Sequence, residues 1–379
     1  MTHRSKHPGA LLFENWQLSL SAPDSWYGEQ EYLLYTDTNI TGALVAGPYE
    51  VLVTGAFDGP APRPSHALRT RDFLRETSGN SLITSEARFT GGGLHEEWAA
   101  LLSLSLGIRV HAGGAYRRFE QGGDPRGYPD LWRDRQPPYL PTAHNSASSI
   151  IPSLTNREVT FTEEDLLTRF HEVTAAQSVA LIKAARAYQA AAWYVQGEPQ
   201  QAWLRLVSAV ETAAVEWDPL NEHPTERLRV SRPEVVRLLL DAGGPELVEA
   251  VAGHLVPTMG ATNKFLKFLT HFCPAPPAVR PDFGQFDYSD RRAFKQAMLK
   301  IYEYRSRALH AGTPFPAPMC WPPLRVGNPD GFLEVSPGLS ASTHLSTWAR
   351  EETPILLHTF EHIVCGALLN WWRSLLPTD

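Results

Sequence analysis

Arg305, Ser306 and His310 place three polar functional groups within a short stretch of the C-terminal half. An unperturbed imidazole titrates near pH ~6.5, so His310 can take up or release a proton under ordinary conditions. The guanidinium of Arg305 keeps its charge and matches phosphate oxygens in a planar fork. Ser306 precedes His310 by four residues, so on a helix its hydroxyl can orient the imidazole or contact a phosphate. These groups predict attack on a phosphodiester, with a general base, a general acid and a cation for the phosphorane.

A helix that begins near Asp290 and closes at Gly312 must position these groups. Its buried face is predicted from apolar residues at helical spacing: Phe294, Met298, Ile301 and Tyr302. Gly312 is a typical residue after a helix end, so His310 lies in the last turn, where the helix dipole favours the protonated ring. Five residues of ideal helix turn Arg305 and His310 well apart, so one helix presents them poorly to a single phosphate.

The run YEYRSRALHAG, which ends at Gly312, resembles the motif of HEPN ribonuclease domains, an Arg followed by a His near a helix end. It is most similar to the Apea-like branch, which is linked to bacterial phage defence, and the resemblance covers roughly the C-terminal half. The family motif usually runs His-Gly, whereas Ala311 separates His310 from Gly312 here. The resemblance implies a metal-independent endoribonuclease without a cofactor, with Arg305, His310 and Ser306 as catalytic residues. It also implies a homodimer in which two motifs face each other on RNA.

Three further residues would support such a site. Glu211 interrupts the apolar stripe of a helix predicted at 199–217, and it resembles the acidic residue that HEPN domains carry on an early helix. It would brace Arg305; a solvent-facing glutamate is the alternative. Tyr302 and Arg307 are the remaining supporting or RNA-binding candidates.

The overall charge does not indicate a nucleic-acid-binding protein, because the formal net charge is −7 and the pI is about 6.1. Any contact surface for RNA must therefore be local. The motif helix offers one, since its basic residues outnumber its acidic ones: Arg291, Arg292, Lys295, Lys300, Arg305 and Arg307 against Asp290 and Glu303. Outside the motif, a solvated helix face explains these charges equally well.

Cysteine usage and hydropathy bear on the compartment. Three scattered cysteines among 379 residues are too few for a disulfide framework, so we expect a reducing cytoplasm. The first residues contain no apolar segment of a signal peptide, and no apolar run is long enough for a membrane span. The expected localisation is cytoplasmic, without a membrane partner.

Residues 1–160 are predicted to form a β-rich N-terminal domain. Its expected regular segments are strands at 32–35, 49–56 and 108–119 and a helix at 94–106, with residues before about 90 mostly in strands. The loop Arg117–Tyr139 is rich in Arg, Gly, Pro and aromatic residues, so it is our candidate contact surface for a phage-derived trigger. The alternatives are a self-paired surface loop and a domain that only stabilises the rest.

Residues 161–379 are predicted to form an all-helical HEPN-like bundle, so the fold class is α+β. The expected helices are 162–194, 199–217, 233–243, 245–272 with an interruption at Pro257, 290–312, and 345–376 with a break at Pro354. A capping box of Thr162 and Asp165 is expected to open the first of them.

A rival site lies in the last predicted helix. The run from His358 to His362 spells His-x-x-Glu-His, the inverted zinc-protease motif, and Cys365 adds a potential ligand. Two histidines four residues apart suit one metal ion, but such proteases need a further ligand well downstream, and none is evident after His362. A zinc hydrolase is therefore the less favoured alternative. The other alternative is a catalytically silent HEPN module that binds RNA or a protein.

Overall fold

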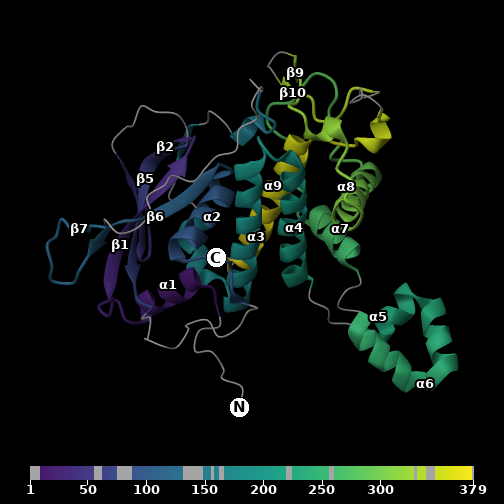
Figure 1. The fold of residues 1–379 in the computed structure, drawn as a ribbon, viewed down its shortest axis with the longest axis horizontal. Coiled ribbons are helices and arrows are strands. Elements are labelled where there is room, and N and C mark those ends of the chain that lie inside the picture. Colours follow the sequence, from purple (N-terminus) through teal and green to yellow (C-terminus); the bar gives the residue numbers. More distant parts are fainter. Residues whose placement is uncertain are drawn as a thin grey trace.

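The computed structural model describes residues 9–54, 62–74, 88–130, 148–154, 158–161, 166–218, 224–255, 260–327, 331–338 and 346–377. Within these ranges the fold is α+β, as predicted, with an antiparallel sheet in the N-terminal part and mostly helices after it (Figure 1). The strands are β1 (Gly28–Thr36), β2 (Asn39–Thr41), β3 (Leu44–Ala46), β4 (Tyr49–Val53), β5 (Arg63–Asp72), β6 (Val110–Phe119), β7 (Tyr128–Pro129), β8 (Glu158–Thr160), β9 (Arg325–Val326) and β10 (Gly331–Phe332). The helices are α1 (Leu11–Ser21), α2 (Leu94–Leu106), α3 (Ala175–Tyr194), α4 (Pro199–Trp217), α5 (Pro224–Ser231), α6 (Pro233–Leu255), α7 (Ala261–His271), α8 (Arg291–Ala311) and α9 (Leu357–Leu375).

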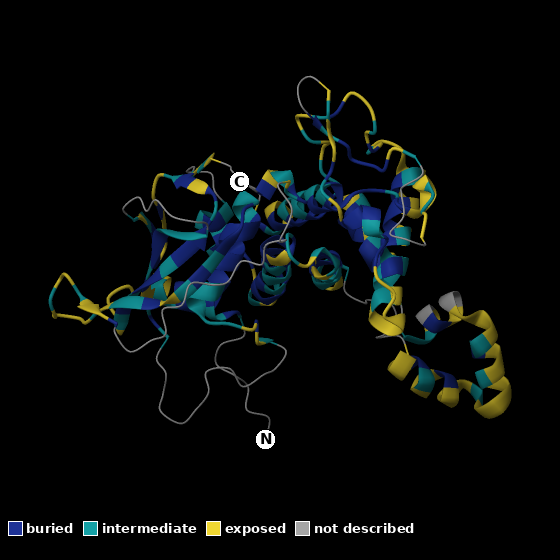
Figure 2. Cartoon of the chain, turned by 45° about the horizontal axis from the view of Figure 1, so that its top comes forward, coloured by how far each residue is buried: buried dark blue, intermediate teal, exposed yellow. Residues whose placement is uncertain are grey.

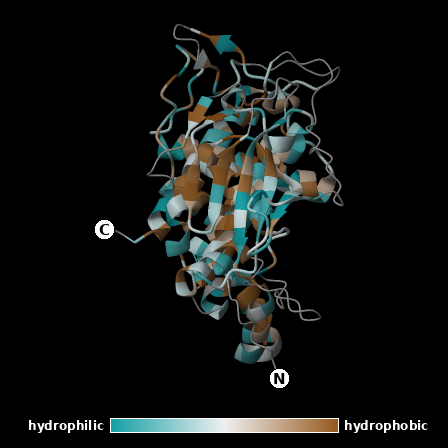
Figure 3. Cartoon of the chain, turned by 90° about the vertical axis from the view of Figure 1, so that its left-hand side faces the viewer, coloured by the Kyte–Doolittle hydropathy of each residue, from teal (hydrophilic) through white to brown (hydrophobic). Residues whose placement is uncertain are grey.

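The main sheet has the strand order β3-β4-β5-β1-β6-β7, and each of these pairings is antiparallel. Tyr32 on β1 stacks on His95 of α2 with ring centroids 4.1 Å apart, so the neighbouring Glu31 points to the opposite face. Cross-strand ion pairs cover that face: Arg69–Glu31 at 2.5 Å and Arg71–Glu29 at 2.8 Å. Figure 3 views the sheet from this side, where hydrophilic and hydrophobic segments share the strands.

The segment before β1 is a helix, α1, rather than the strand that we expected for most of this region. Leu12 and Trp16 bury one face of α1 in the core. Its first turn is held by distant side chains, because the backbone N–H of Leu12 donates to Glu97 at 2.7 Å and that of Ala10 donates to Ser178 at 3.1 Å. These long-range contacts satisfy the free N–H groups of the helix start, which sequence pattern alone does not reveal.

Glu97 is a carboxyl group enclosed by the core at the junction of α1 and α2. It is fully buried and hydrogen-bonds to the Thr90 hydroxyl as well as to Leu12. Burial raises the pKa of Glu97 to about 7, although its hydrogen bonds act in the opposite direction. The α2 helix that carries it has the predicted bounds, and Gly107 closes it in the left-handed conformation with φ 60°.

The helices after β8 pack with α2 into one continuous core. Trp371 and Trp372 of α9 are fully buried, and their rings lie 6.0 Å from Phe268 and 6.4 Å from Phe170. The same cluster of buried side chains extends from Ala10 to Leu376, so it crosses the predicted boundary at residue 160. Figure 1 shows the order in space, with α2 between the sheet and α3, and α4, α7 and α8 beyond.

Local punctuation explains most helix bounds in this part. Pro199 occupies the first turn of α4, and α4 ends at Trp217 as predicted. The capping box predicted at residues 162–165 lies outside the described residues; α3 begins later, where Thr174 caps it and Gln177 reciprocates. The α9 helix begins at Leu357, after Pro354, so the predicted start at residue 345 was too early.

Helices α5 and α6 lie apart from the rest of the molecule (Figure 1). Residues Gly243 and Gly244 interrupt α6 with non-helical backbone angles, as their types predicted. The two helices share a small separate cluster of buried side chains: Leu228, Val236, Val248 and Ala252. Most of their surface is exposed, as Figure 2 shows. No described helix combines the length and apolar character needed to cross a lipid bilayer.

The described part of the loop Arg117–Tyr139 pairs with its own neighbourhood. Arg118 lies 3.4 Å from Asp130, and Arg126 lies 2.8 Å from Asp124. These contacts agree with the alternative of a self-paired surface loop. Residues 131–139 of the predicted contact surface lie outside the described residues.

Candidate active site at the end of helix α8

Both ends of α8 are defined by residues that the sequence offered for these roles. The Asp290 carboxylate accepts from the backbone N–H groups of Arg292 at 2.9 Å and Ala293 at 3.0 Å, so it caps the first turn. Gly312 follows the last turn in the left-handed conformation, with φ 63°. The buried stripe differs from the prediction at one position, because Tyr304 rather than Tyr302 is the more buried tyrosine.

Glu211 of α4 connects to two residues of the motif. One carboxylate oxygen accepts from Nη2 of Arg305 at 2.8 Å, and the other accepts from the Tyr302 hydroxyl at 2.8 Å. The Arg305 guanidinium also lies over the Tyr302 ring, 5.5 Å from its centroid. The predicted contact between Glu211 and Arg305 is therefore present, and Glu211 does not simply face solvent.

This three-residue cluster is partly shielded from solvent and electrostatically coupled. The side chains of Arg305 and Glu211 are 22% and 20% exposed, which strengthens their attraction relative to a surface pair. Burial raises the pKa of Tyr302 to about 12, and its hydrogen bond to the Glu211 carboxylate adds to the shift. Nε of Arg305 is buried, and no described group accepts from it. The contacts with Glu211 and Tyr302 hold the Arg305 guanidinium in the C-terminal part of α8.

The other motif residues are not drawn into this cluster. His310 is exposed and Ser306 is half-buried, and the structure gives neither side chain a hydrogen-bond partner among the described residues. Arg307 is paired with Glu303, and its guanidinium lies 5.8 Å from the Tyr304 ring centroid. At 3.6 residues per turn, Arg305 and His310 point about 140° apart around the helix axis. Within one chain, the Arg305 guanidinium and the His310 imidazole therefore lie on different sides of α8.

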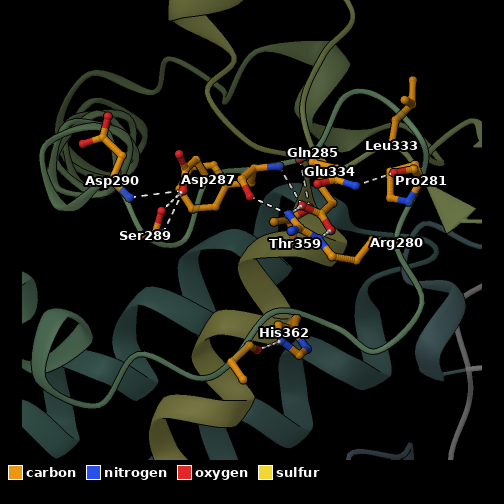
Figure 4. A network of polar contacts seen from close by, with 12 residues as sticks. Arg280, Pro281, Gln285, Asp287, Ser289, Asp290, Leu333, Glu334, Thr359 and His362 are labelled. Carbon is orange, nitrogen blue, oxygen red and sulfur yellow. Dashed lines mark hydrogen bonds and ion pairs between the residues drawn. The ribbon is translucent and has the colours of Figure 1, made fainter.

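The rival motif on α9 is dispersed among separate partners. Nε2 of His358 donates to the carbonyl oxygen of Leu333 at 2.7 Å, whereas Nε2 of His362 donates to that of Ala275 at 2.9 Å. In Figure 4, the contact that His362 makes is separate from the polar contacts around Thr359. Glu361 instead accepts from the Tyr188 hydroxyl at 2.6 Å. The described residues contain no group of three His, Cys, Asp or Glu arranged to hold a metal ion.

The centre of the contacts in Figure 4 is Glu334, which the sequence did not single out. Its carboxylate is buried and accepts from Arg280 at 2.8 and 2.6 Å and from the backbone N–H of Phe286 at 2.7 Å. These contacts tie the segment before α8 to the segment before α9. Because Glu334 lies in a proline-rich stretch without helical period, only the folded structure brings out its role.

A pocket of about 540 Å³ lies between α7 and α8, next to the end of α4. Its lining includes Trp217, Lys267, His271, Arg291 and Lys295. The sequence indicated Arg291 and Lys295 as part of a local basic surface, but it did not connect them with Trp217. One weak sequence signal for this pocket was Lys267, because the spacing of the apolar residues in α7 places it on the exposed face of that helix.

Comparison with known proteins adds no further constraint, since we find no family model, curated protein or solved structure that matches this chain.

Proposed function

We propose that this protein is a metal-independent endoribonuclease that acts as a homodimer through Arg305 and His310. The observation that carries the proposal is the end of α8: Glu211 and Tyr302 hold the Arg305 guanidinium there, and the exposed His310 follows in the last turn. A guanidinium with a fixed position can stabilise charge that develops on a phosphate without reorganising. An exposed imidazole can reach a ribose hydroxyl or a leaving oxygen.

The proposed reaction uses the RNA itself as the nucleophile. His310 takes the proton from a ribose 2′-hydroxyl, whose oxygen attacks the adjacent phosphorus, and Arg305 stabilises the negative phosphorane. The P–O5′ bond then breaks as the protonated imidazole of His310 donates its proton to the leaving O5′. The products are a 2′,3′-cyclic phosphate and a 5′-hydroxyl end. Ser306 shares a helix face with His310 and would orient its ring or contact the phosphate.

The dimer follows from the separation within one chain. Since Arg305 and His310 point about 140° apart on α8, a two-fold arrangement of α8 helices would place the cation of one protomer near the imidazole of the other. A monomer that cleaves RNA at full rate at high dilution would contradict this part of the proposal.

The test maps new 5′ ends in total RNA from cells that express the wild type or His310→Ala. We expect new 5′-hydroxyl ends with the wild type only, and purified wild-type protein should produce the same ends on isolated RNA. A matched control is His254→Ala, on the outlying helix α6. Equal cleavage by the wild type and by His310→Ala would contradict the assignment.

A second candidate, a silent module that binds RNA or a protein, is favoured by one contact. Arg305 already forms an ion pair with Glu211, so its charge is partly balanced before any phosphate arrives. This alternative predicts RNA binding or protein capture without new RNA ends. The same mapping experiment, combined with a binding measurement, separates the two candidates.

The cellular role extends the proposal. The similarity of the motif to Apea-like HEPN domains suggests cytoplasmic antiviral defence, with a phage-derived trigger that acts through the N-terminal sheet. Cells that carry the wild-type gene should survive or limit phage infection better than cells with His310→Ala. Because one core joins the sheet to the helices, this comparison uses the full chain rather than a fragment.

A further inference from the structure

The pocket between α7 and α8 has an uncompensated positive rim. Arg291 and Lys295 are exposed, and neither forms an ion pair with any described residue. Lys267, on the opposite side, is paired with Asp218 at 3.4 Å, and its side chain is 67% exposed. A surface pair of this kind contributes little and is readily exchanged for another anion. Three cations therefore line one pocket, and Lys267 alone among them forms an ion pair with a described residue.

Other basic residues of α8 behave differently. Lys300 lies 3.1 Å from Glu303, and Arg307 pairs with the same carboxylate. The exposed Arg292 is a neighbour of Arg291 but does not line the pocket. Lys300 and Arg307 are thus compensated within α8, whereas Arg291, Arg292 and Lys295 form no ion pair with a described residue, and of these three only Arg291 and Lys295 line the pocket.

An aromatic wall completes the pocket. The Trp217 ring is half-buried and packs edge-on against Phe268, with centroids 5.9 Å apart and an interplanar angle of 80°. Two further rings lie close to it: His271 at 4.9 Å and 33°, and Phe272 at 5.3 Å and 69°. These contacts fix the indole in one orientation while part of it lines the pocket. A fixed aromatic ring beside several cations is the arrangement that single-stranded nucleic acids use for stacking and phosphate contacts.

The pocket and the proposed active site share helix α8. Arg291, Lys295, Tyr302 and Arg305 follow one helical stripe, and Tyr302 lies 5.2 Å from the Phe265 ring of α7. Ten residues separate Lys295 from Arg305, which corresponds to about 15 Å along the helix axis. A strand that is bound in the pocket and reaches Arg305 would therefore pass over the side chains that cover Met298, which lies between them on α8 and is fully buried.

We propose that this pocket binds a single-stranded segment of RNA next to the cleaved phosphodiester. Phosphates contact Arg291, Lys295 and Lys267, and a base stacks on Trp217. This inference rests on the proposed ribonuclease function and adds the position of the substrate strand. The part of the Trp217 ring that lines the pocket favours RNA, whose bases can stack on it, over an acidic protein segment, which would use the cations alone.

The experiment measures binding of a 5′-fluorescein-labelled oligouridylate of about 12 nucleotides to full-length His310→Ala protein by fluorescence anisotropy, in EDTA. Arg291→Gln combined with Lys295→Gln should weaken binding about tenfold or more and reduce the salt dependence by about 0.7 per lost phosphate contact. The matched control, Arg237→Gln combined with Arg373→Gln, removes the same charge from two exposed positions outside the pocket and should bind like the parent. Trp217→Phe should retain most of the affinity, whereas Trp217→Leu should lose about tenfold.

The outcomes separate the two proposals. If the wild type cleaves RNA but the pocket pair and the control pair bind it equally well, the pocket proposal is overturned and the nuclease stands. If no cleavage occurs but the binding depends on the pocket, the pocket stands and the nuclease proposal fails. Binding of polyglutamate that depends on the pocket, without such binding of oligouridylate, would overturn the RNA assignment in favour of an acidic protein.

Discussion

Helix α8 carries His310 five residues after Arg305, and helix α9 carries His358 and His362 four residues apart, yet the surroundings of these histidines are opposite in kind. On α9, the imidazoles of His358 and His362 each donate to a backbone carbonyl. On α8, His310 is exposed, and the motif residue Arg305 is held by Glu211 of α4. Burial lowers the pKa of His358, because the charged ring would lose its hydration, so that imidazole stays neutral over most of the physiological range.

The difference shows how partners distinguish structural from reactive groups. A buried polar group that has its partners stabilises the fold, and removing one member leaves the other unsatisfied. An exposed group without a partner contributes little to the fold and is free to act on another molecule. The three polar residues of the short pattern on α9 thus each make their own structural contact, whereas on α8 Arg305 is held by Glu211 and His310 is exposed.

The largest expected effect concerns α8. We expect Arg305→Ala and His310→Ala each to reduce the rate of RNA cleavage at least ~10²-fold, since a positioned proton-transfer group is worth about 10²–10⁴ in rate. His310→Ala should leave the melting temperature unchanged, because the side chain is exposed. Cleavage rates on purified RNA and thermal unfolding are the two measurements. The matched control on α9 is His362→Gln, which should cleave RNA at the wild-type rate. Loss of cleavage in His362→Gln would contradict the conclusion that the histidines of α9 are structural.

The next largest effect concerns the buried ion pair between Glu334 and Arg280. Glu334→Ala leaves the Arg280 guanidinium without its carboxylate, and loss of one member of a buried ion pair costs about 3–5 kcal/mol. Denaturant unfolding should therefore show a lower free energy of unfolding by about 3 kcal/mol. The exposed Glu351→Ala serves as control and should change stability little. A Glu334→Ala protein as stable as the control would show that these contacts do not hold the segments together.

Glu97 extends the contrast to a buried acid whose pKa is raised. The folded state holds the proton up to about pH 7, whereas the unfolded carboxyl releases it near 4.5. Stability from this group is therefore present at low pH and is lost as the pH rises from about 4.5 to about 7, by an amount on the order of 3 kcal/mol. Unfolding of wild type and Glu97→Gln across pH 4–8 measures the difference.

Only the wild type should show this additional decline with pH. Parallel stability curves for wild type and Glu97→Gln would mean that Glu97 titrates alike in the folded and unfolded states.

The smallest expected effect is none at all. The proposed reaction uses a guanidinium, an imidazole and the ribose hydroxyl, so cleavage should proceed at the same rate in an excess of EDTA. Gel assays with and without chelator measure this directly. Loss of cleavage in EDTA, restored by Zn²⁺, would move the reaction to the histidines of α9.

Elements with local signals could be predicted well from the sequence. Helices α2, α4 and α8 begin and end at glycines, prolines or capping residues, and their observed bounds agree closely with the prediction. The contact between Glu211 and Arg305 was also expected, on the resemblance of the motif. The residues that determine these helix bounds lie within one turn of the helix end, and the Glu211–Arg305 contact follows from a motif that can be recognised in the sequence.

Features that depend on distant residues were missed. The start of α1 is held by Glu97 and Ser178, which lie far along the chain. The Glu334 contacts join segments without periodicity, and the pocket combines three helices. The predicted contact surface in the loop Arg117–Tyr139 could be compared with the structure only as far as Asp130. Sequence pattern reports which residues share a face, but it does not report which faces meet.

The outlying position of α5 and α6 has a consequence for amide hydrogen exchange. Among the residues whose side chains are described, their separate cluster contains four buried apolar side chains, whereas α3, α4 and α9 share the main core. A unit with so few buried contacts opens by local fluctuations that leave the rest intact. Its amides should therefore exchange with deuterium long before those of the central helices, which become accessible only when the core as a whole unfolds.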